Sequence, residues 1–490
     1  MQIKKVNMFL KKMTLLTKSK YLNGLQCPRL LWFTDRKQLP ELTLSDEHKF
    51  SQGHKFEEYV KKLYPDGVDL NVSEFKDNLD KTKQAIEEKK TIFEAGFMID
   101  NLFVRSDLLI PTDNGWDLYE IKSTTQVKPQ HMPDLAFQKY VLKKSGLKIN
   151  RSFVIFLNKE YIKNGKINPK ELISQEEVTE KVNLIDDIEA NIKIFQEVIN
   201  MDLPPDVCIS MQCNKPYDCP LKKECWETLP KNNVLHLTNW RVYWKLLEEG
   251  IEDIKDIPPG TKLTAKDEII IESIKTNKPY ISKEHIKHFL SSLNYPLFNF
   301  DFETFDTAVP LFDNSRPYQK IPFQYSLHIE QKDGSIEHNE YLAEGNNDPR
   351  LALLEQMKVD LEGTGDIIVF NKSFEISVMK KLAENFPEHD GWLQKAISRI
   401  VDLTDVFRPF YYYNSSQKGS YSIKKVLPAV TGKSYSDLDI GNGANASMLY
   451  FYSHIKPKLE NKEEIRENLL KYCCLDTEGM VWIIDALRKI

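Results

Sequence analysis

Asp107 and the segment Glu120-Ile121-Lys122 place two carboxylates and a lysine close together in the sequence. Adjacent carboxylates hold Mg²⁺ or Mn²⁺, which polarises a scissile phosphate and activates water for attack. A lysine beside them can orient that water or stabilise the charge that develops. His54 could supply a nitrogen ligand that favours Mn²⁺. These residue types predict a metal site for phosphodiester cleavage, with a solvated hairpin as the simpler alternative.

Four cysteines flank this set, one early in the chain and three late, with five residues between the late neighbours. Thiolates from both ends of one domain would close it around a soft metal or an iron–sulfur cluster. The four are Cys27, Cys213, Cys219 and Cys225. A structural Zn²⁺ on Cys208 and the three late cysteines is the alternative, although it leaves Cys27 without a role. Cys208, Cys473 and Cys474 are otherwise expected to be plain buried thiols.

A second pair of carboxylates lies in Phe300-Asp301-Phe302-Glu303-Thr304. Because side chains alternate along a strand, Asp301 and Glu303 share one face and the phenylalanines take the other. Burying such a pair without a cation is costly, so a metal is the expected partner. Near the C-terminus, Tyr472 and Asp476 are spaced by four, which puts them on one side of a helix.

A β-hairpin is expected to position the first site. Residues 102–110 and 116–122 are predicted strands, and Pro111-Thr112-Asp113-Asn114-Gly115 is typical of the turn between them, because Asn-Gly accepts positive φ. A turn about Asn114-Gly115 places Asp107 opposite Lys122, and a turn one residue earlier places it opposite Glu120 or Ile121. Either register brings Asp107 beside Glu120, with Glu120 and Lys122 on one face.

The chain is predicted to be an α/β protein with three parts. Residues 1–228 mix helical and strand patterns and end in the cysteine cluster. Residues 229–292 are predicted to form a helical, polar linker. In residues 293–490, strands such as 366–370 alternate with helices such as 374–384, which is the α/β pattern.

Composition agrees with a folded, multidomain chain. A length of 490 residues predicts about three domains, and 41% apolar residues suffice for sizeable cores. The net charge of −5 decides nothing about nucleic acid, because 67 Lys and Arg residues could still line a groove. No run approaches the roughly 18 apolar residues of a membrane span, and lysines interrupt Met1 to Lys20, so neither a membrane segment nor a signal peptide is expected. Seven cysteines do not suggest a secreted disulfide framework, which favours a cytoplasmic location.

On these motifs, the N-terminal part resembles the RecB-like PD-(D/E)XK nucleases of the iron–sulfur type, as in AddB and the CRISPR-associated adaptation nucleases. The resemblance covers residues 15–228 and implies a restriction-endonuclease-like fold. It implies that the four flanking cysteines ligate a [4Fe–4S] cluster. It also implies a catalytic set of His54, Asp107, Glu120 and Lys122. The family carries Gln-x-x-x-Tyr on the next helix; this chain has Gln138-Lys139-Tyr140, so Gln138 would position substrate.

The C-terminal part resembles the DEDD exonucleases of the RNase H-like fold. That resemblance implies two metal ions about 4 Å apart and a tyrosine, Tyr472, that positions the attacking water. Its middle motif is Asn-x-x-Phe-Asp, whereas here Asn371-Lys372-Ser373-Phe374-Glu375 ends in glutamate; Asp402 is an alternative ligand. The implied metal ligands are Asp301, Glu303, Glu375 and Asp476. A structural domain with a vestigial site is the alternative.

The order of parts also resembles a domain-of-unknown-function family that joins such a nuclease to an RNase H-like domain. Cys27-Pro28-Arg29-Leu30-Leu31-Trp32 and Pro322-Phe323-Gln324-Tyr325-Ser326-Leu327-His328 carry this resemblance. The expected activity is metal-dependent hydrolysis of DNA from its ends, in repair or in defence against foreign DNA. The expected partner is nucleic acid, most of all DNA with free ends or single strands. A nucleic-acid-binding scaffold and an RNA-processing 3′–5′ exonuclease are the alternatives.

Overall fold

The computed structural model describes residues 14–71, 74–436 and 438–490. These residues form a mixed α/β structure, which confirms the predicted class. They divide into two compact units: unit 1 contains the chain up to Glu41, Ser51–Tyr161 and Gly165–Glu227, and unit 2 contains Leu42–Phe50, Ile162–Asn164 and Thr228–Ile490. Within the described ranges, every helix is too short or too polar to cross a membrane. The expectation for Met1 to Lys20 falls mostly on residues 1–13, which lie outside the described residues.

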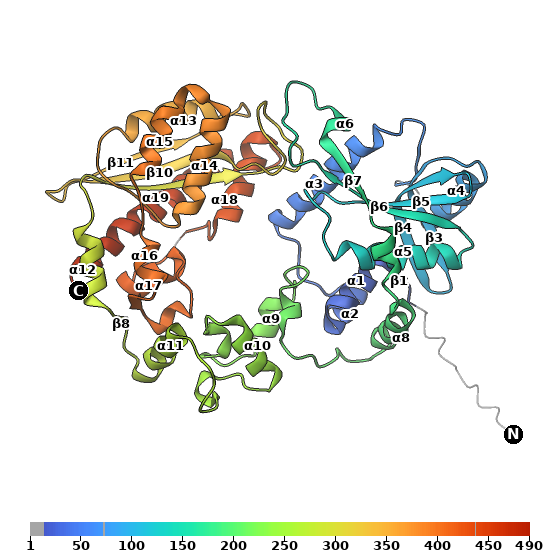
Figure 1. The fold of residues 1–490 in the computed structure, drawn as a ribbon, viewed down its shortest axis with the longest axis horizontal. Coiled ribbons are helices and arrows are strands. Elements are labelled where there is room, and N and C mark those ends of the chain that lie inside the picture. Colours follow the sequence, from blue (N-terminus) through green and yellow to red (C-terminus); the bar gives the residue numbers. More distant parts are fainter. Residues whose placement is uncertain (1–13, 72–73, 437) are drawn as a thin grey trace. The chain divides into compact units, whose positions relative to one another are not determined.

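Unit 1 is built on one mixed sheet in the order β2-β3-β4-β5-β6-β7, with β1 paired to β4 (Figure 1). Its central strands are buried and mostly apolar, as expected for strands covered on both faces. The strands are β1 (Leu16–Thr17), β2 (Val68–Asp69), β3 (Ile92–Ile99), β4 (Leu102–Thr112), β5 (Gly115–Ile121), β6 (Ile149–Leu157) and β7 (Ile173–Glu177).

The predicted hairpin is β4–β5, and its turn is Asp113-Asn114, because Thr112 pairs with Gly115. The structure therefore takes the second predicted register, the one with the turn a residue earlier, and Leu108 lies opposite Tyr119. Gly115 has φ 147° and its position would bring a Cβ within 2.5 Å of the Lys148 carbonyl oxygen, so glycine fits where larger residues would clash.

Several helices of the first half contact this sheet, α4 and α5 among them. Tyr21 of α1 stacks on Phe137 of α5, with ring centroids 4.2 Å apart, inside the unit 1 core. Pro28 begins α2 at its first turn, where a missing N–H costs nothing. The helices are α1 (Lys18–Gln26), α2 (Pro28–Asp35), α3 (Leu44–Lys61), α4 (Phe75–Glu87), α5 (His131–Lys144), α6 (Pro169–Leu172), α7 (Thr179–Asn183), α8 (Ile188–Ile199) and α9 (Lys222–Trp226).

Unit 2 is organised around a sheet in the order β11-β10-β9-β12-β13. Strands β9 and β10 are antiparallel, as are β10 and β11, whereas β12 joins β9 and β13 in parallel. Phe298, Phe300 and Phe302 pack into one core with α13, α14 and α15, as the alternation predicts. The strands are β9 (Leu297–Phe305), β10 (Ile321–Glu330), β11 (Ile336–Leu342), β12 (Ile367–Val369) and β13 (Ile400–Asp402).

The opposite face of this sheet carries the acidic residues and packs against α18 (Gly443–Tyr450) and the long helix α19 (Lys462–Arg488), and α17 (Ile423–Thr431) packs on α19. The three-layer arrangement leaves the carboxylates between strands and helices. Residues 229–292, predicted as a linker, contain α10, α11, β8 and α12. The remaining bounds are α10 (Trp240–Glu248), α11 (Ala265–Thr276), β8 (Tyr280–Ile281), α12 (Lys283–Ser291), α13 (Arg350–Asp360), α14 (Lys372–Asn385), α15 (Asp390–Ser398), α16 (Thr404–Phe407), β14 (Tyr412–Tyr413), α17 (Ile423–Thr431), α18 (Gly443–Tyr450) and α19 (Lys462–Arg488).

Candidate metal centres and the cysteine cluster

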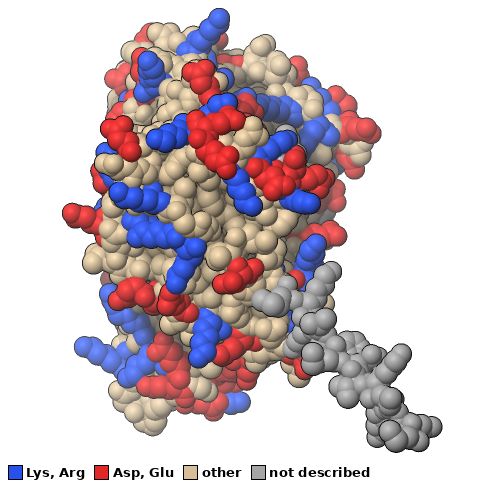
Figure 2. Space-filling model, turned by 90° about the vertical axis from the view of Figure 1, so that its right-hand side faces the viewer, with Lys and Arg blue, Asp and Glu red and all other residues tan. Residues whose placement is uncertain are grey.

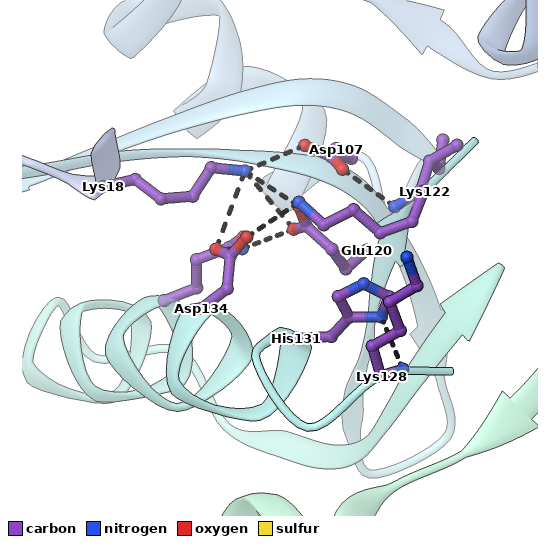
Figure 3. Close-up of polar contacts among 9 residues, drawn as sticks. Lys18, Asp107, Glu120, Lys122, Lys128, His131 and Asp134 are labelled. Carbon is purple, nitrogen blue, oxygen red and sulfur yellow. Dashed lines mark hydrogen bonds and ion pairs between the residues drawn. The ribbon is translucent and has the colours of Figure 1, made fainter. Parts of the chain in front are cut away.

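Asp107 and Glu120 come together on the hairpin, and the chain around them holds each in place. Oδ2 of Asp107 accepts a hydrogen bond from the Ile121 N–H at 2.8 Å. Nζ of Lys122 lies 2.6 Å from Oε1 of Glu120, which is 1% exposed. The structure thus brings together three of the residues that the spacing singled out (Figure 3).

Helix α5 adds a third carboxylate, Asp134, which the sequence analysis missed. Lys122 Nζ lies 2.9 Å from Asp134 Oδ2. Gln138, one helical turn further, donates to Glu120 Oε2 at 2.5 Å and to Asp134 Oδ1 at 2.9 Å. Gln138 therefore orients both carboxylates, while Tyr140 donates to Glu189 outside this cluster. The signal was available, because Asp134 precedes Gln138 by four residues on the same helix.

Lys18 is the second residue that the sequence did not indicate, and it reaches the centre of the cluster (Figure 3). Its Nζ lies 3.2 Å from Asp107 Oδ1, 3.1 Å from Glu120 Oε1 and 3.8 Å from Asp134 Oδ1. Thr17 caps α1 by accepting from the Lys20 N–H, and this cap fixes the helix start that carries Lys18. Three carboxylates share two ammonium groups here, so one negative charge is left in excess.

Two further glutamates lie near Asp107. Burial, followed by the charges of Asp107 and Glu57, raises the pKa of Glu94 to about 7. Burial and then Asp107 also raise the pKa of Glu57. Glu94 adopts φ 57° within β3, a backbone strain that tends to occur at functional sites. In the sequence, Glu94 could have been recognised as the single acid in the apolar run Ile92-Phe93-Glu94-Ala95.

His54 lies inside α3, which begins at Leu44. Its side chain is exposed, and across the described residues no hydrogen bond or ion pair joins it to Asp107 or Glu120. Its nearest link to the site is electrostatic, since it lowers the pKa of Glu57 against the larger effect of burial. Glu57, one turn further along α3, interacts electrostatically with Asp107, whose charge raises the pKa of Glu57.

A cavity of about 550 Å³ opens beside this cluster and is lined by Lys18, Lys122 and Tyr217 among others. His131, 1% exposed, also lines it. Its Nδ1 accepts from the Lys128 N–H at 3.3 Å, which places the ring proton on Nε2. That buried nitrogen has no hydrogen-bond partner in the described part of the chain. Burial, and then Lys122, lowers the pKa of His131 to about 4, so the ring is neutral.

The cysteine cluster assembles as its spacing suggested. Cys27 lies at the junction of α1 and α2 and lines a single small cavity with Cys213, Cys219, Cys225 and the exposed Cys208. Gln26 ties the two ends of the unit together by donating to the carbonyls of Gln212 and Tyr217 at 3.0 and 2.7 Å. Of the three thiols predicted to be buried, Cys473 is buried, whereas Cys208 is exposed and Cys474 is half-buried.

The two cofactors considered for these thiols space their sulfur ligands differently. Tetrahedral Zn²⁺ with Zn–S bonds of about 2.3 Å holds its sulfurs about 3.8 Å apart. Among the described residues, only two groups have their donor atoms within 4.8 Å of one another, and the cysteines are not one of them. A four-iron cube spreads its ligands more widely, because each thiolate binds a different iron. All four thiols line one cavity, as either cofactor requires.

In unit 2, Asp301 and Glu303 of β9 and Asp476 of α19 bring carboxylate oxygens within 4.8 Å of one another. Burial, followed by Asp476, raises the pKa of both Asp301 and Glu303. Burial also raises the pKa of Asp476 to about 6. The three acids line a cavity of about 530 Å³ with Tyr472. Hard cations prefer such an oxygen set.

Lys424 and Tyr435 complete this site and were not predicted to act in it. Tyr435 donates to Asp476 Oδ1 at 2.5 Å. Lys424 Nζ donates to the Tyr472 hydroxyl at 2.8 Å and to the Gly441 carbonyl at 2.9 Å. Burial lowers the pKa of Lys424, against the three acids, which raise it. Tyr472 therefore sits between a lysine and the carboxylates, where the sequence placed it.

Glu375 and Asp402 have different surroundings. Glu375 is 2% exposed, and its Oε2 has no hydrogen-bond partner among the described residues. Burial raises the pKa of Glu375 to about 8, and its charge raises that of Asp301. Asp402 instead caps α14, accepting from the N–H groups of Asn371 and Lys372, each at 3.2 Å, and pairs with Arg408. These bonds give Asp402 a structural role, which argues against it as a metal ligand.

Comparison with known proteins supports the resemblance to a domain-of-unknown-function family. Residues 298–422 match the family model described as a domain of unknown function (DUF2779). A region of this chain is 31% identical to "Uncharacterized protein UU173" of Ureaplasma parvum, covering 39% of this chain and 31% of the relative. Another is 24% identical to "Uncharacterized protein MG366" of Mycoplasma genitalium, covering 46% and 38%. The matches span about a third of the length of these curated relatives.

Proposed function

We propose that the chain is a metal-dependent nuclease that hydrolyses phosphodiester bonds in DNA, with one hydrolytic site in each unit. One arrangement, found in both units, carries the proposal: strand carboxylates meet a helix aspartate and a lysine beside a cavity. In unit 1 these are Asp107, Glu120 and Asp134 with Lys122. In unit 2 they are Asp301, Glu303 and Asp476 with Lys424. Unit 1 would be the PD-(D/E)XK nuclease and unit 2 the RNase H-like exonuclease.

The residues present fit divalent metal ions. Three buried acids with raised pKa values carry an electrostatic cost in unit 2 that a hard cation would relieve. Bound Mg²⁺ or Mn²⁺ would supply Lewis-acid activation of the phosphate and of a water molecule. The residues that would hold it are Asp107 and Glu120 in unit 1, and Asp301, Glu303 and Asp476 in unit 2, with Glu375 beside them.

The other groups would bind and orient the substrate. Lys18, Lys122 and the unpartnered Nε2–H of His131 line one cavity together with Asp134, so two cations and a donor face the same space as one carboxylate. Such a lining suits an anionic phosphate rather than a neutral ligand. As water attacks phosphorus and the P–O bond breaks, Lys122 would stabilise the added charge on the phosphate oxygens. In unit 2, Tyr472 would orient the attacking water.

The charges on the surface do not by themselves indicate a binding partner. Lys and Arg side chains are interspersed with Asp and Glu over the face drawn in Figure 2. This distribution agrees with a net charge of −5. The lysines inside the two cavities, rather than a broad basic field on this face, support a nucleic-acid ligand.

The cysteines would hold a [4Fe–4S] cluster that ties the start of unit 1 to its end. Their role in this proposal is structural, because the cavity that Cys27, Cys213, Cys219 and Cys225 line does not include the carboxylates. Iron and sulfide analysis of anaerobically purified protein would test it. Zinc in place of iron, with Cys27→Ala retaining the metal, would contradict the cluster.

Cleavage of end-labelled DNA and RNA in Mn²⁺ tests the activity and separates the two sites. Asp301→Asn should abolish shortening from 3′ ends and keep the cuts made by unit 1. Glu120→Gln should abolish the cuts made by unit 1 and keep shortening from 3′ ends. Asp333→Asn, in the exposed turn between β10 and β11, is the matched control for the first change. Wild-type products from the Asp301→Asn, Glu120→Gln double variant would refute the proposal. Shortening of RNA alone would make unit 2 an RNA-processing exonuclease.

A further inference from the structure

A second group of metal-ligating side chains lies in unit 2 outside the carboxylate cluster. His328 of β10, His338 of β11 and Cys474 of α19 bring one donor atom each within 4.8 Å of the others. His328 and His338 are directly opposite each other in the antiparallel pair, and their rings stack with centroids 4.3 Å apart. His328 is 7% exposed, whereas His338 faces solvent. Three separate elements thus converge on one point.

A chain of hydroxyl groups fixes the protons of both histidines. Thr477 donates its only hydroxyl proton to the Cys474 carbonyl at 3.0 Å. It must therefore accept from Ser326 at 2.7 Å and from His328 Nδ1 at 2.8 Å. Ser326, having donated, accepts from His338 Nε2 at 3.0 Å. Both imidazoles consequently carry their protons on the nitrogens used here.

The other ring nitrogens, His328 Nε2 and His338 Nδ1, are left with lone pairs. No hydrogen bond among the described residues uses either of them. A second ring nitrogen held by a hydrogen bond is the usual support of a metal-bound histidine. The hydrogen-bond network therefore leaves one ring nitrogen of each histidine available to a cation.

The donor set indicates which cation. Two imidazoles and one thiolate suit Zn²⁺, whereas Mg²⁺ and Mn²⁺ prefer oxygen. Glu340 lies close by, because its Oε2 is 3.9 Å from His338 Nε2 and its charge acts on Cys474, but it is not among the donors that lie within 4.8 Å of one another. Tetrahedral zinc needs its donors about 3.3–3.8 Å apart, and the solvent-facing ring of His338 can make that adjustment.

We propose that His328, His338 and Cys474 bind one Zn²⁺ ion that fastens α19 to β10 and β11. The site is distinct from the hydrolytic one, yet it acts on the same helix. Tyr472 and Asp476 lie on α19, on either side of Cys474 in the sequence. The zinc ion therefore sets the position of the helix that supplies Asp476 to the carboxylate cluster. This inference stands whether or not unit 2 hydrolyses nucleic acid.

Metal analysis of the purified full-length protein tests the site. Zinc and iron are measured in wild type, His338→Ala, Cys474→Ser and His288→Ala, an exposed histidine on α12 that serves as the control. We expect the first two variants to lose about one zinc per chain, as a single mononuclear site requires, while iron stays constant and His288→Ala matches wild type. His338 faces solvent, so its replacement should leave the fold intact. Equal zinc in all four proteins overturns the proposal.

A spectroscopic readout identifies the ligands directly. Co²⁺ exchanged into the zinc site should give a thiolate-to-cobalt absorption band that disappears in Cys474→Ser. In His338→Ala the band should shift or vanish, and His288→Ala should keep it. Hydrogen exchange in α19 should quicken on zinc chelation in wild type and not in His338→Ala. A cobalt band that survives Cys474→Ser overturns the assignment.

Discussion

Replacing Lys18 by methionine tests whether an ammonium group and a divalent cation share one carboxylate cluster. Lys18 Nζ contacts Asp107 Oδ1 at 3.2 Å and Glu120 Oε1 at 3.1 Å, and it lies 3.8 Å from Asp134 Oδ1. Lys122 is then the remaining cation against three carboxylates. Lys18→Met thus raises the excess from one negative charge to two. We expect unit 1 to lose stability in the absence of metal.

The size of the loss follows from burial. Removing one partner of a buried ion pair costs about 3–5 kcal/mol. The side chain of Lys18 is 22% exposed, so the lower end of this range, about 3 kcal/mol, applies. Mn²⁺ at 100 times its Kd stabilises the folded state by about 2.7 kcal/mol through mass action. In wild type the same ion must displace Lys18, so Mn²⁺ should stabilise the variant more than wild type.

Hydrogen exchange of peptides from β4 and β5 measures this difference within unit 1. In EDTA, exchange in Lys18→Met should quicken about 10²-fold, since each 1.4 kcal/mol is tenfold. In Mn²⁺ most of that difference should disappear. Lys20→Met is the matched control, because Lys20 lies on the same helix and pairs with Asp35 at 2.8 Å, outside the cluster. Equal losses in EDTA and Mn²⁺ would refute the shared site.

Other changes probe the remaining groups. Lys122→Ala should slow cleavage by unit 1 about 10²–10³-fold while DNA binding changes little, measured with unit 2 disabled by Asp301→Asn; an unchanged rate would contradict its role. Glu375→Asp should slow 3′-end shortening about tenfold, because the shorter side chain retreats from Asp301; a wild-type rate would remove Glu375 from the site. Tyr435→Phe deletes the hydrogen bond that lowers the pKa of Asp476. The variant should therefore lose more Mn²⁺ affinity relative to wild type at pH 6 than at pH 8, and an equal loss at both pH values would contradict this. Without metal, unit 2 should lose stability as pH rises from about 4 to about 6, because folding raises the pKa of Asp476 from 3.8 to about 6 and the unfolded chain ionises first; a rising urea midpoint over that range would exclude this.

The sequence predicted those parts of the sites that depend on local periodicity. Asp301 and Glu303 share a face because a strand repeats every two residues, and Tyr472 and Asp476 share a side because a helix nearly repeats every four. The hairpin was foreseen in both registers, and the observed one depends on which pair of residues forms the turn. Thr112 pairing with Gly115 settled it. Both Asp113-Asn114 and Asn114-Gly115 suit a two-residue turn, so the turn residues alone do not select the register.

Residues contributed by distant elements were not predictable in this way. Lys18 reaches Glu120 across 102 positions of sequence, and a lysine in a helix has no local feature that shows its partner. Lys424 likewise looks like an ordinary basic residue until Tyr472 is placed beside it. His54 is the reverse case, since its residue type suggested a metal ligand, but it is exposed and the described residues show no hydrogen bond or ion pair between it and Asp107 or Glu120. Long-range packing decides these positions, and a single sequence does not display it.

The two sites differ in how the negative charge of their carboxylates is compensated. In unit 1, Lys18 and Lys122 form ion pairs of 2.6–3.8 Å with the carboxylates, so the protein supplies most of the neutralising charge itself. In unit 2, Lys424 gives its hydrogen bonds to Tyr472 and to a carbonyl, and the acids respond by raised pKa values. Protons there stand in for a missing positive charge. A cation entering unit 2 displaces protons, whereas one entering unit 1 displaces a tethered lysine, and this contrast makes metal uptake by unit 2 the more dependent on pH.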